Sequence, residues 1–235
     1  MTYAISDIHG EYELLLKLLE KIGFSNSDKL YVLGDMIDKG DKSVHVLKLL
    51  FSMPNVTCIV GNHEYAFLKY YWGLMRQATG DYDAVLKKLQ DYFTDGSLLD
   101  WDIIDRFEGL PCYVEENEYF GVHAGIPIRA DRTLVHPKEA MTEHLVYDRD
   151  FKEFGTKIAP TEKCVLYGHT PTRYLTNTDN ILFHRREGIK TPVNISDYAR
   201  IHLDTGVSVS GVLGCLCIED CKCYYVKNCL EGTWI

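Results

Sequence analysis

Five short apolar runs in this chain are each followed at once by aspartate, histidine, asparagine or glycine residues. Each run has the length and composition of a buried β-strand. In α/β proteins, ligands bind where the carboxyl ends of such strands meet, so this repetition constrains both the fold and the place of a functional site. The polar clusters occupy residues 6–10, 34–40, 61–64, 123–125 and 168–171.

The first three runs alternate with helical patterns. Strands predicted at residues 2–5, 30–33 and 56–60 are separated by helices predicted at residues 11–22 and 44–51, where apolar residues recur at helical spacing. The order strand, loop, helix, repeated three times, predicts an α/β fold with a parallel sheet and helices on both of its faces.

Residues 65–107 break this alternation. The stretch is helical in pattern, rich in tyrosine and tryptophan, and interrupted at residues 78–81 and 94–97, so we expect a helical insertion beside the site. The chain contains no linker, repeat or low-complexity segment, and we therefore expect a single domain over residues 1–235. The later strands are predicted at residues 112–114, 119–122, 164–167 and 199–203, with a hairpin over residues 211–226.

Composition limits the compartment and the partners. The net charge of −9 argues against binding to duplex nucleic acid, whose protein partners carry basic surfaces. No apolar segment reaches the length of a membrane-spanning helix, so we expect no membrane partner. The first strand is predicted to begin at residue 2, so we expect no signal peptide and a cytoplasmic protein, with its eight cysteines reduced or bound to metal.

The side chains at the strand ends have the chemistry of metal ligands. They are carboxylates, imidazoles and an amide without a thiolate, a mixture that suits manganese, iron or zinc better than magnesium or calcium. In an extended segment Asp7 and His9 would point to the same side. The carboxylate of Asp35 can bridge two cations held ~3.5–4 Å apart, which lower the pKa of a shared water and clamp phosphate oxygens. The candidate ligands are Asp7, His9, Asp35, Asn62, His123 and His169.

Each motif taken alone has an ordinary explanation. An Asp-x-His pair occurs in turns, a lone histidine beside glycine is commonly a loop residue, and residues 61–64 could be a helix cap followed by a surface histidine. Five such motifs at five predicted strand ends favour a dinuclear metal centre over these separate explanations.

The order of the motifs resembles that of the calcineurin-like metallophosphoesterases. The shared motifs are Asp-x-His-Gly, Gly-Asp-x-x-Asp-x-Gly, Gly-Asn-His-Glu, His-Ala-Gly and Gly-His-Thr. Within that superfamily the chain is most similar to the bacterial and phage-type phosphoprotein phosphatases, the branch that includes the symmetrical diadenosine tetraphosphate hydrolases. The resemblance spans residues 3–225 and implies a four-layer α/β/β/α sandwich with two metal ions at the sheet edges.

The resemblance also implies a role for each motif residue. The ligands would be Asp7, His9 and a bridging Asp35 for the first ion, and Asp35, Asn62, His123 and His169 for the second. His63 would be the general acid that protonates the leaving group, and Asp38 would orient it. Arg149 stands where phage-type enzymes have a phosphate-binding arginine, although an ion pair with Asp148 or Asp150 is the ordinary alternative.

Two neighbouring residues give opposing indications of the substrate. The family usually has arginine where Lys39 stands, and lysine supplies charge to a phosphate without bidentate geometry. A lysine here is similar to a subgroup of the diadenosine tetraphosphate hydrolases. Asp38, conversely, is typical of the protein phosphatases.

The resulting hypothesis is a phosphomonoesterase with two divalent cations, with manganese preferred over iron or zinc. It would act on phosphoserine or phosphothreonine in a protein or peptide, and also on phosphotyrosine, by direct in-line attack of a metal-bridging hydroxide. The alternative is a pyrophosphohydrolase of dinucleoside polyphosphates or nucleotide caps, in which aromatic residues of the insertion could stack on a base. A third hypothesis, a binding protein with a degenerate site, conflicts with the complete ligand set.

Other polar residues receive structural explanations. A C-x-C-x₃-C-x-C pattern is formed by Cys215, Cys217, Cys221 and Cys223. Its spacing could bind zinc or an iron–sulfur cluster, but the cysteines alternate within two predicted strands and we expect them to pack as small hydrophobic residues. Glu64 is explained by favourable charge at a helix N-terminus. Asp204, at another strand end, would support the metal centre.

Overall fold

The computed structural model describes residues 1–93, 98–153 and 157–228. Within these residues the strands form two sheets of five. In spatial order, the first sheet contains β10 (Cys223–Lys227), β9 (Val212–Cys217), β1 (Thr2–Ile5), β2 (Lys29–Val32) and β3 (Val56–Cys58). The second contains β4 (Tyr113–Glu115), β5 (Tyr119–Val122), β6 (Cys164–Tyr167), β8 (Tyr198–His202) and β7 (Leu182–Arg185). The central strands β1, β2 and β3 are parallel, as are β5, β6 and β8, and the remaining strands are antiparallel to their neighbours.

The helices begin and end at recognisable local signals. The helix after β1 ends at Gly23, whose left-handed backbone (φ 62°) allows its N–H to bond back to the last turn. Asp81 and Asp100 cap two helices of the insertion, each accepting a backbone N–H three residues on. None of the described helices is both long and apolar enough to span a bilayer. The α-helices are α1 (Tyr12–Ile22), α2 (Ser43–Ser52), α3 (Asn62–Gln77), α4 (Tyr82–Gln90), α5 (Trp101–Glu108), α6 (Thr142–Tyr147), α7 (Arg173–Thr176) and α8 (Val207–Ser210).

The two sheets pack face to face. Tyr3 and Ile5 of β1 pack with the residues of α1 and α2, whereas Ala4 between them faces the second sheet. The prediction of helices on both faces of one sheet is therefore wrong, because the inner face of each sheet is covered by the other sheet. The four-layer α/β/β/α arrangement is confirmed. The core between the sheets includes Ala4, Tyr31, Leu33, Leu166 and Ile201.

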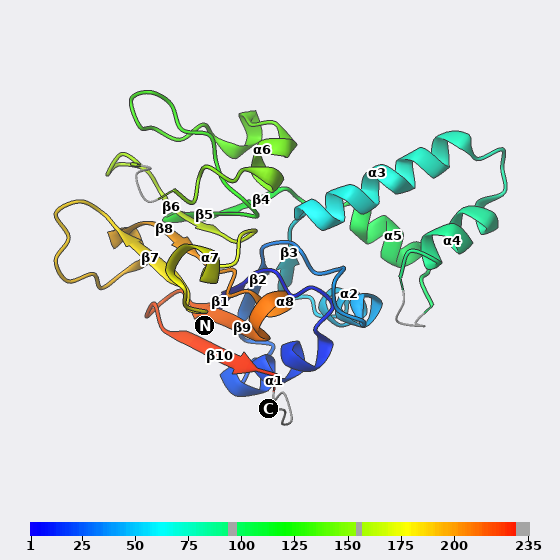
Figure 1. Cartoon of the computed structure of the whole chain (residues 1–235), viewed down its shortest axis with the longest axis horizontal. Helices are drawn as coiled ribbons and strands as arrows, with labels where there is room; N and C mark the ends of the chain where they lie inside the picture. Colours follow the sequence, from blue (N-terminus) through cyan, green and yellow to red (C-terminus); the bar gives the residue numbers. More distant parts are fainter. Residues whose placement is uncertain (94–97, 154–156, 229–235) are drawn as a thin grey trace.

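The helical insertion lies outside these layers. Helices α3, α4 and α5 project away from the sheets in Figure 1. The predicted break at residues 78–81 is confirmed, and the break predicted at residues 94–97 lies outside the described residues. The insertion leaves from β3, an edge strand of the first sheet, and returns at β4, an edge strand of the second.

Candidate metal centre

The ends of five strands bring the six predicted ligands together. The side chains come from both sheets, and all except Asn62 are at least nine-tenths buried. Two groups of side chains, which share Asp35, have ligand atoms within 4.8 Å of one another: Asp35 with His123 and His169, and Asp35 with His9 and His63, the residue predicted as the general acid. The ligands follow the strands in the order Asp7 and His9 after β1, Asp35 after β2, Asn62 after β3, His123 after β5 and His169 after β6.

One half of the centre is formed by four convergent ligand atoms. Asn62 Oδ1 lies 2.8 Å from His169 Nδ1 and 3.0 Å from His123 Nε2. The same His123 nitrogen lies 3.4 Å from Asp35 Oδ1. His123 donates its Nδ1 proton to the Leu33 carbonyl at 2.8 Å, so Nε2 keeps the lone pair that a cation needs.

The other half is arranged around His9. Its Nδ1 bonds to the Ile37 carbonyl at 3.0 Å, which again leaves the lone pair on Nε2. That nitrogen lies 3.6 Å from Asp35 Oδ2 and 3.9 Å from Asp7 Oδ1. The Lys39 ammonium lies 2.7 Å from it. Because the ammonium uses the same lone pair, a cation bound to His9 Nε2 requires Lys39 to move.

The backbone around the centre is strained. Asp7 and His9 have φ angles of 54° and 48°, so the extended conformation predicted for this segment is wrong. Such left-handed residues cost about 1–3 kcal/mol each and persist where surrounding contacts impose them. Here the loops after β1 and β2 bond to each other through Asp7 N–H to Gly34 O and His9 N–H to Asp35 O. The left-handed residues of the centre are Asp7, His9, Asp35, Asp38, Lys39 and His169.

The burial and charge of the candidate ligands fit the binding of divalent cations. Asp7 Oδ1 is buried without a hydrogen-bond partner among the described residues. Burial, together with the charges of Asp7 and Glu64, raises the pKa of Asp35 well above its ordinary value. Buried carboxylates and facing lone pairs are costly unless positive charge compensates them. The residues therefore fit two cations that share Asp35.

Glu64 has a larger role than the sequence indicated. Its side chain is completely buried and accepts backbone N–H groups from Asp35 and Met36, each at 2.7 Å, and from Gly61 at 2.8 Å. It thereby fixes the loop that carries Asp35, and favourable charge at a helix terminus is not a sufficient explanation. The available signal was its place three residues after Gly61, where a glutamate can reach back to the start of its helix.

His63 and Asp38 form a hydrogen-bonded pair at the rim. His63 Nδ1 lies 2.6 Å from Asp38 Oδ2, and each side chain is about a quarter exposed. Burial lowers the pKa of His63, but the hydrogen bond to Asp38 and the charges of Asp35 and Asp38 outweigh it and raise the pKa above its ordinary value. Nε2, 3.8 Å from Asp35 Oδ2, is the ring atom left to exchange a proton with a ligand.

Two exposed, positively charged side chains, Arg149 and Lys39, flank the ligand cluster. Arg149 reaches Thr170, the neighbour of His169, with Nη1 3.5 Å from Oγ1. The carboxylate of Asp148, one of its predicted ion-pair partners, accepts two backbone N–H groups. Lys39 lies beside His9, in the other half of the centre. A phosphate chain across the ligands could therefore meet positive charge at two places.

The four cysteines of the β9–β10 hairpin do not converge. Cys215 and Cys217 pack into the core that contains the helices, whereas Cys221 and Cys223 pack against the core between the sheets. The register confirms this division, because Cys223 pairs with Leu216. Among the described residues these cysteines form no metal-binding group. The expectation that they pack as small hydrophobic residues is confirmed.

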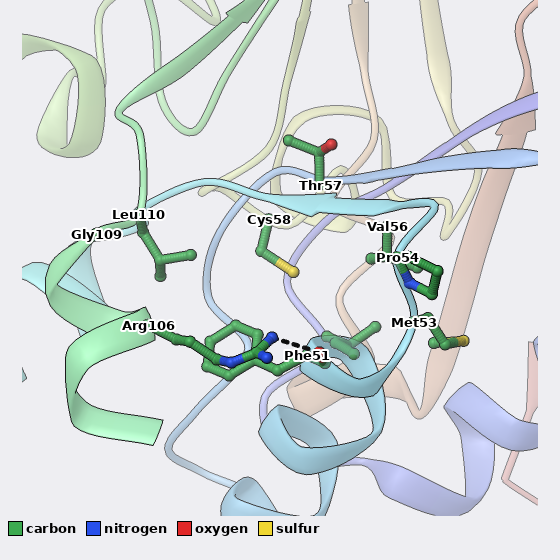
Figure 2. A pocket seen from close by; sticks show the side chains of 10 residues that line it. Phe51, Met53, Pro54, Val56, Thr57, Cys58, Arg106, Gly109 and Leu110 are labelled. Carbon is green, nitrogen blue, oxygen red and sulfur yellow. Dashed lines mark hydrogen bonds between the residues drawn. The ribbon is translucent and has the colours of Figure 1, made fainter. Parts of the chain in front are cut away.

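A hollow of about 450 Å³ lies between α2, β3 and α5, away from the ligands. Figure 2 shows Cys58 pointing into this hollow and Arg106 beside Phe51. The Phe51 carbonyl accepts a hydrogen bond from the Arg106 guanidinium at 2.6 Å. Burial raises the pKa of the Cys58 thiol, which disfavours a nucleophilic thiolate. None of the candidate ligands or catalytic residues lines this hollow.

Comparisons with curated proteins agree with the motif order. The family profile described as calcineurin-like phosphoesterase matches residues 2–197. The symmetrical bis(5'-nucleosyl)-tetraphosphatase of Cellvibrio japonicus is 34% identical over 184 residues, 75% of this chain and 65% of that protein. The protein of the same name from Nitrosomonas europaea is 34% identical over 127 residues, 53% of this chain and 44% of that protein. The chain thus spans less than two thirds of the length of either relative.

Solved structures share the fold. A candidate diadenosine tetraphosphatase superposes with a TM-score of 0.63 at 20% identity, covering 98% of this chain and 94% of that chain. A protein serine/threonine phosphatase from Saccharomyces cerevisiae superposes with a TM-score of 0.58 at 14% identity, covering 98% and 81%. At these identities the likeness concerns the architecture alone.

Proposed function

The chain belongs to the calcineurin-like phosphoesterases, and we propose that it hydrolyses dinucleoside polyphosphates, cleaving diadenosine tetraphosphate symmetrically into two molecules of ADP. The observation that carries this choice of substrate is the 34% identity to two proteins named as symmetrical bis(5'-nucleosyl)-tetraphosphatases. It favours the second of the functional hypotheses above over the first. The broader prediction, a metal-dependent phosphoester hydrolase, agrees with the family.

The site supports hydrolysis of a phosphate anhydride or ester. Two divalent cations bound there would supply positive charge to phosphate oxygens and lower the pKa of water near them. Lys39 and Arg149 would bind phosphates on either side of the scissile bond, since they flank the ligand cluster. A tetraphosphate chain carries negative charge on several phosphate groups. It can therefore contact two positively charged side chains that lie apart, such as Lys39 and Arg149.

The identity of the metal and the cellular compartment of the protein are also part of this proposal. The carboxylate, imidazole and amide ligands favour manganese, with iron or zinc as alternatives. The cytoplasmic location predicted from the composition stays a prediction.

A protein phosphatase is the second candidate, and the His63–Asp38 pair favours it. The leaving group from phosphoserine or phosphothreonine is a strongly basic alkoxide, which needs a proton as it departs. His63 Nε2 could give that proton while Asp38 holds the ring through Nδ1. An ADP leaving group is a much weaker base and depends less on an acid.

Parallel assays distinguish the two candidates. The manganese-loaded enzyme is assayed on diadenosine tetraphosphate, a phosphothreonine peptide, a phosphotyrosine peptide and para-nitrophenyl phosphate, and the nucleotide products are separated by chromatography. We expect the highest kcat/KM on diadenosine tetraphosphate, with ADP as the sole product. A higher value on either peptide, or formation of AMP and ATP, would contradict the proposal.

A further inference from the structure

The helical insertion reaches the catalytic pair through one side chain. Tyr92 follows α4, and its hydroxyl donates to Asp38 Oδ2 at 3.1 Å. The same oxygen lies 2.6 Å from His63 Nδ1. Among the described residues, His63 and Tyr92 are the side chains that hydrogen-bond to the Asp38 carboxylate. Burial and the Asp38 charge raise the pKa of Tyr92, so the phenol stays protonated and remains a donor.

The Tyr92 ring is itself fixed by aromatic packing. It lies edge-on to Phe67 and Phe93, with centroids 5.1 and 5.2 Å away, and stacks on Tyr70 at 6.0 Å. Phe67 and Tyr70 follow His63 by four and seven residues on α3, so they share one face of the helix with it. The hydroxyl is therefore held in a fixed position relative to the histidine.

We propose that Tyr92 is a positioning residue that holds the Asp38 carboxylate and thereby aims the His63 ring at the leaving group. Without this hydrogen bond, Asp38 is held by His63 alone and the two side chains can turn together away from the site. The proposal rests on the phosphoester hydrolysis proposed as the second candidate for this site, because that leaving group needs a proton, and it gives the insertion a part in proton transfer. A role in ring packing alone predicts instead that loss of the hydroxyl has no effect.

Tyr92→Phe tests this, since it removes the hydroxyl and keeps the ring. The matched control is Tyr70→Phe, which removes a hydroxyl from the exposed ring stacked on Tyr92. On a phosphothreonine peptide or an alkyl phosphate with the manganese-loaded enzyme, we expect Tyr92→Phe to lower kcat about tenfold with KM unchanged. Tyr70→Phe is expected to change neither parameter by more than about twofold.

A double-mutant cycle separates positioning through His63 from general damage. In a His63→Ala background, Tyr92→Phe should cause no further loss of kcat, because the group that it aims is gone. An equal loss in both backgrounds, no loss in the single variant, or a change in KM alone would overturn the inference.

A second measurement does not depend on activity. The proton shared by His63 Nδ1 and Asp38 should give a downfield proton NMR resonance, which we expect to shift or broaden in Tyr92→Phe and to stay unchanged in Tyr70→Phe. An unaltered resonance in Tyr92→Phe would overturn the inference. Inactivity of the wild-type enzyme on diadenosine tetraphosphate and on every phosphoester would instead refute the proposed function, and the resonance would still decide the role of Tyr92.

Discussion

Two regions of this protein concentrate residues that bind metals elsewhere, and they differ in geometry. At the strand ends the ligands come from separate loops whose left-handed backbone turns their side chains toward one point. In the β9–β10 hairpin, Cys215 and Cys217 lie two residues apart on β9 and share one face, whereas Cys223 pairs with Leu216 and packs on the opposite face, as does Cys221 in the turn. Ligand chemistry is present in both regions, but only the first brings its ligands together.

The two regions also differ in how their polar groups are satisfied. The strand-end centre contains buried atoms without partners and a buried glutamate that binds backbone amides. In the hairpin, Cys215 is packed among apolar side chains and the Cys217 thiol donates to the Glu219 carboxylate, while burial raises the pKa of the Cys217 thiol to about 12. Ligand atoms that converge within a few ångströms of one another are therefore a better guide to a metal site here than the count of potential ligands.

The largest expected effect is that of His63→Ala. We expect kcat on a phosphothreonine peptide to fall about 10²–10⁴-fold, because the departing alkoxide loses its proton donor. The loss on para-nitrophenyl phosphate should be much smaller, since nitrophenolate departs without a proton. Steady-state kinetics on both substrates and metal analysis of the purified variant check this. Equal losses on both substrates would show that His63 is not the acid.

Next comes Glu64→Gln, which replaces an acceptor of several backbone N–H groups by a side chain that carries two N–H donors of its own. We expect a loss of about 2–4 kcal/mol in the free energy of unfolding, because buried amides lose an acceptor. Metal affinity should fall about tenfold or more as the Asp35 loop loosens. Urea unfolding and metal titration measure the two effects. Glu13→Gln on the exposed face of α1 is the control, and a similar loss there would contradict this role of Glu64.

A smaller effect is expected for Cys215→Ser in the hairpin. The hydroxyl would be buried among apolar side chains, which should cost about 1–3 kcal/mol of stability. Metal content and kcat should be unchanged, because the described cysteines of the hairpin do not converge into a metal-binding group. Chemical denaturation and elemental analysis report on the two quantities. Loss of bound metal in this variant would remove the distinction between the two regions.

The smallest effect is expected for Cys223→Ser, on the opposite face of the same hairpin. This side chain is only partly buried, so the change in unfolding free energy should stay within about 0.5–1 kcal/mol. Measured beside Cys215→Ser, it separates the cost of burial from any role shared by the cysteines. A matching loss in both variants would point to a common function.

The sequence predicted much of the fold and the gathering of the ligands. The strand–loop–helix order and the polar strand ends depend on local patterns, and these survive in the structure. The prediction of helices on both faces was wrong because the second sheet covers the inner face, a long-range arrangement that local periodicity does not encode. The supports provided by Glu64 and Tyr92 were missed for a related reason, since each acts across about 30 residues or more of chain.

The route of the insertion has a consequence for how this protein can change over evolution. The insertion departs from one sheet edge and re-enters at another, so no strand pairing depends on its length or sequence. Recombination could replace the insertion by that of a relative and leave the two sheets and the strand-end loops with the metal ligands unchanged. The incoming segment must again offer a hydroxyl to Asp38 and must again pack on α2, where Arg106 of α5 donates to the Phe51 carbonyl. Substrate preference could then diversify by recombination at a site where the rest of the fold tolerates it.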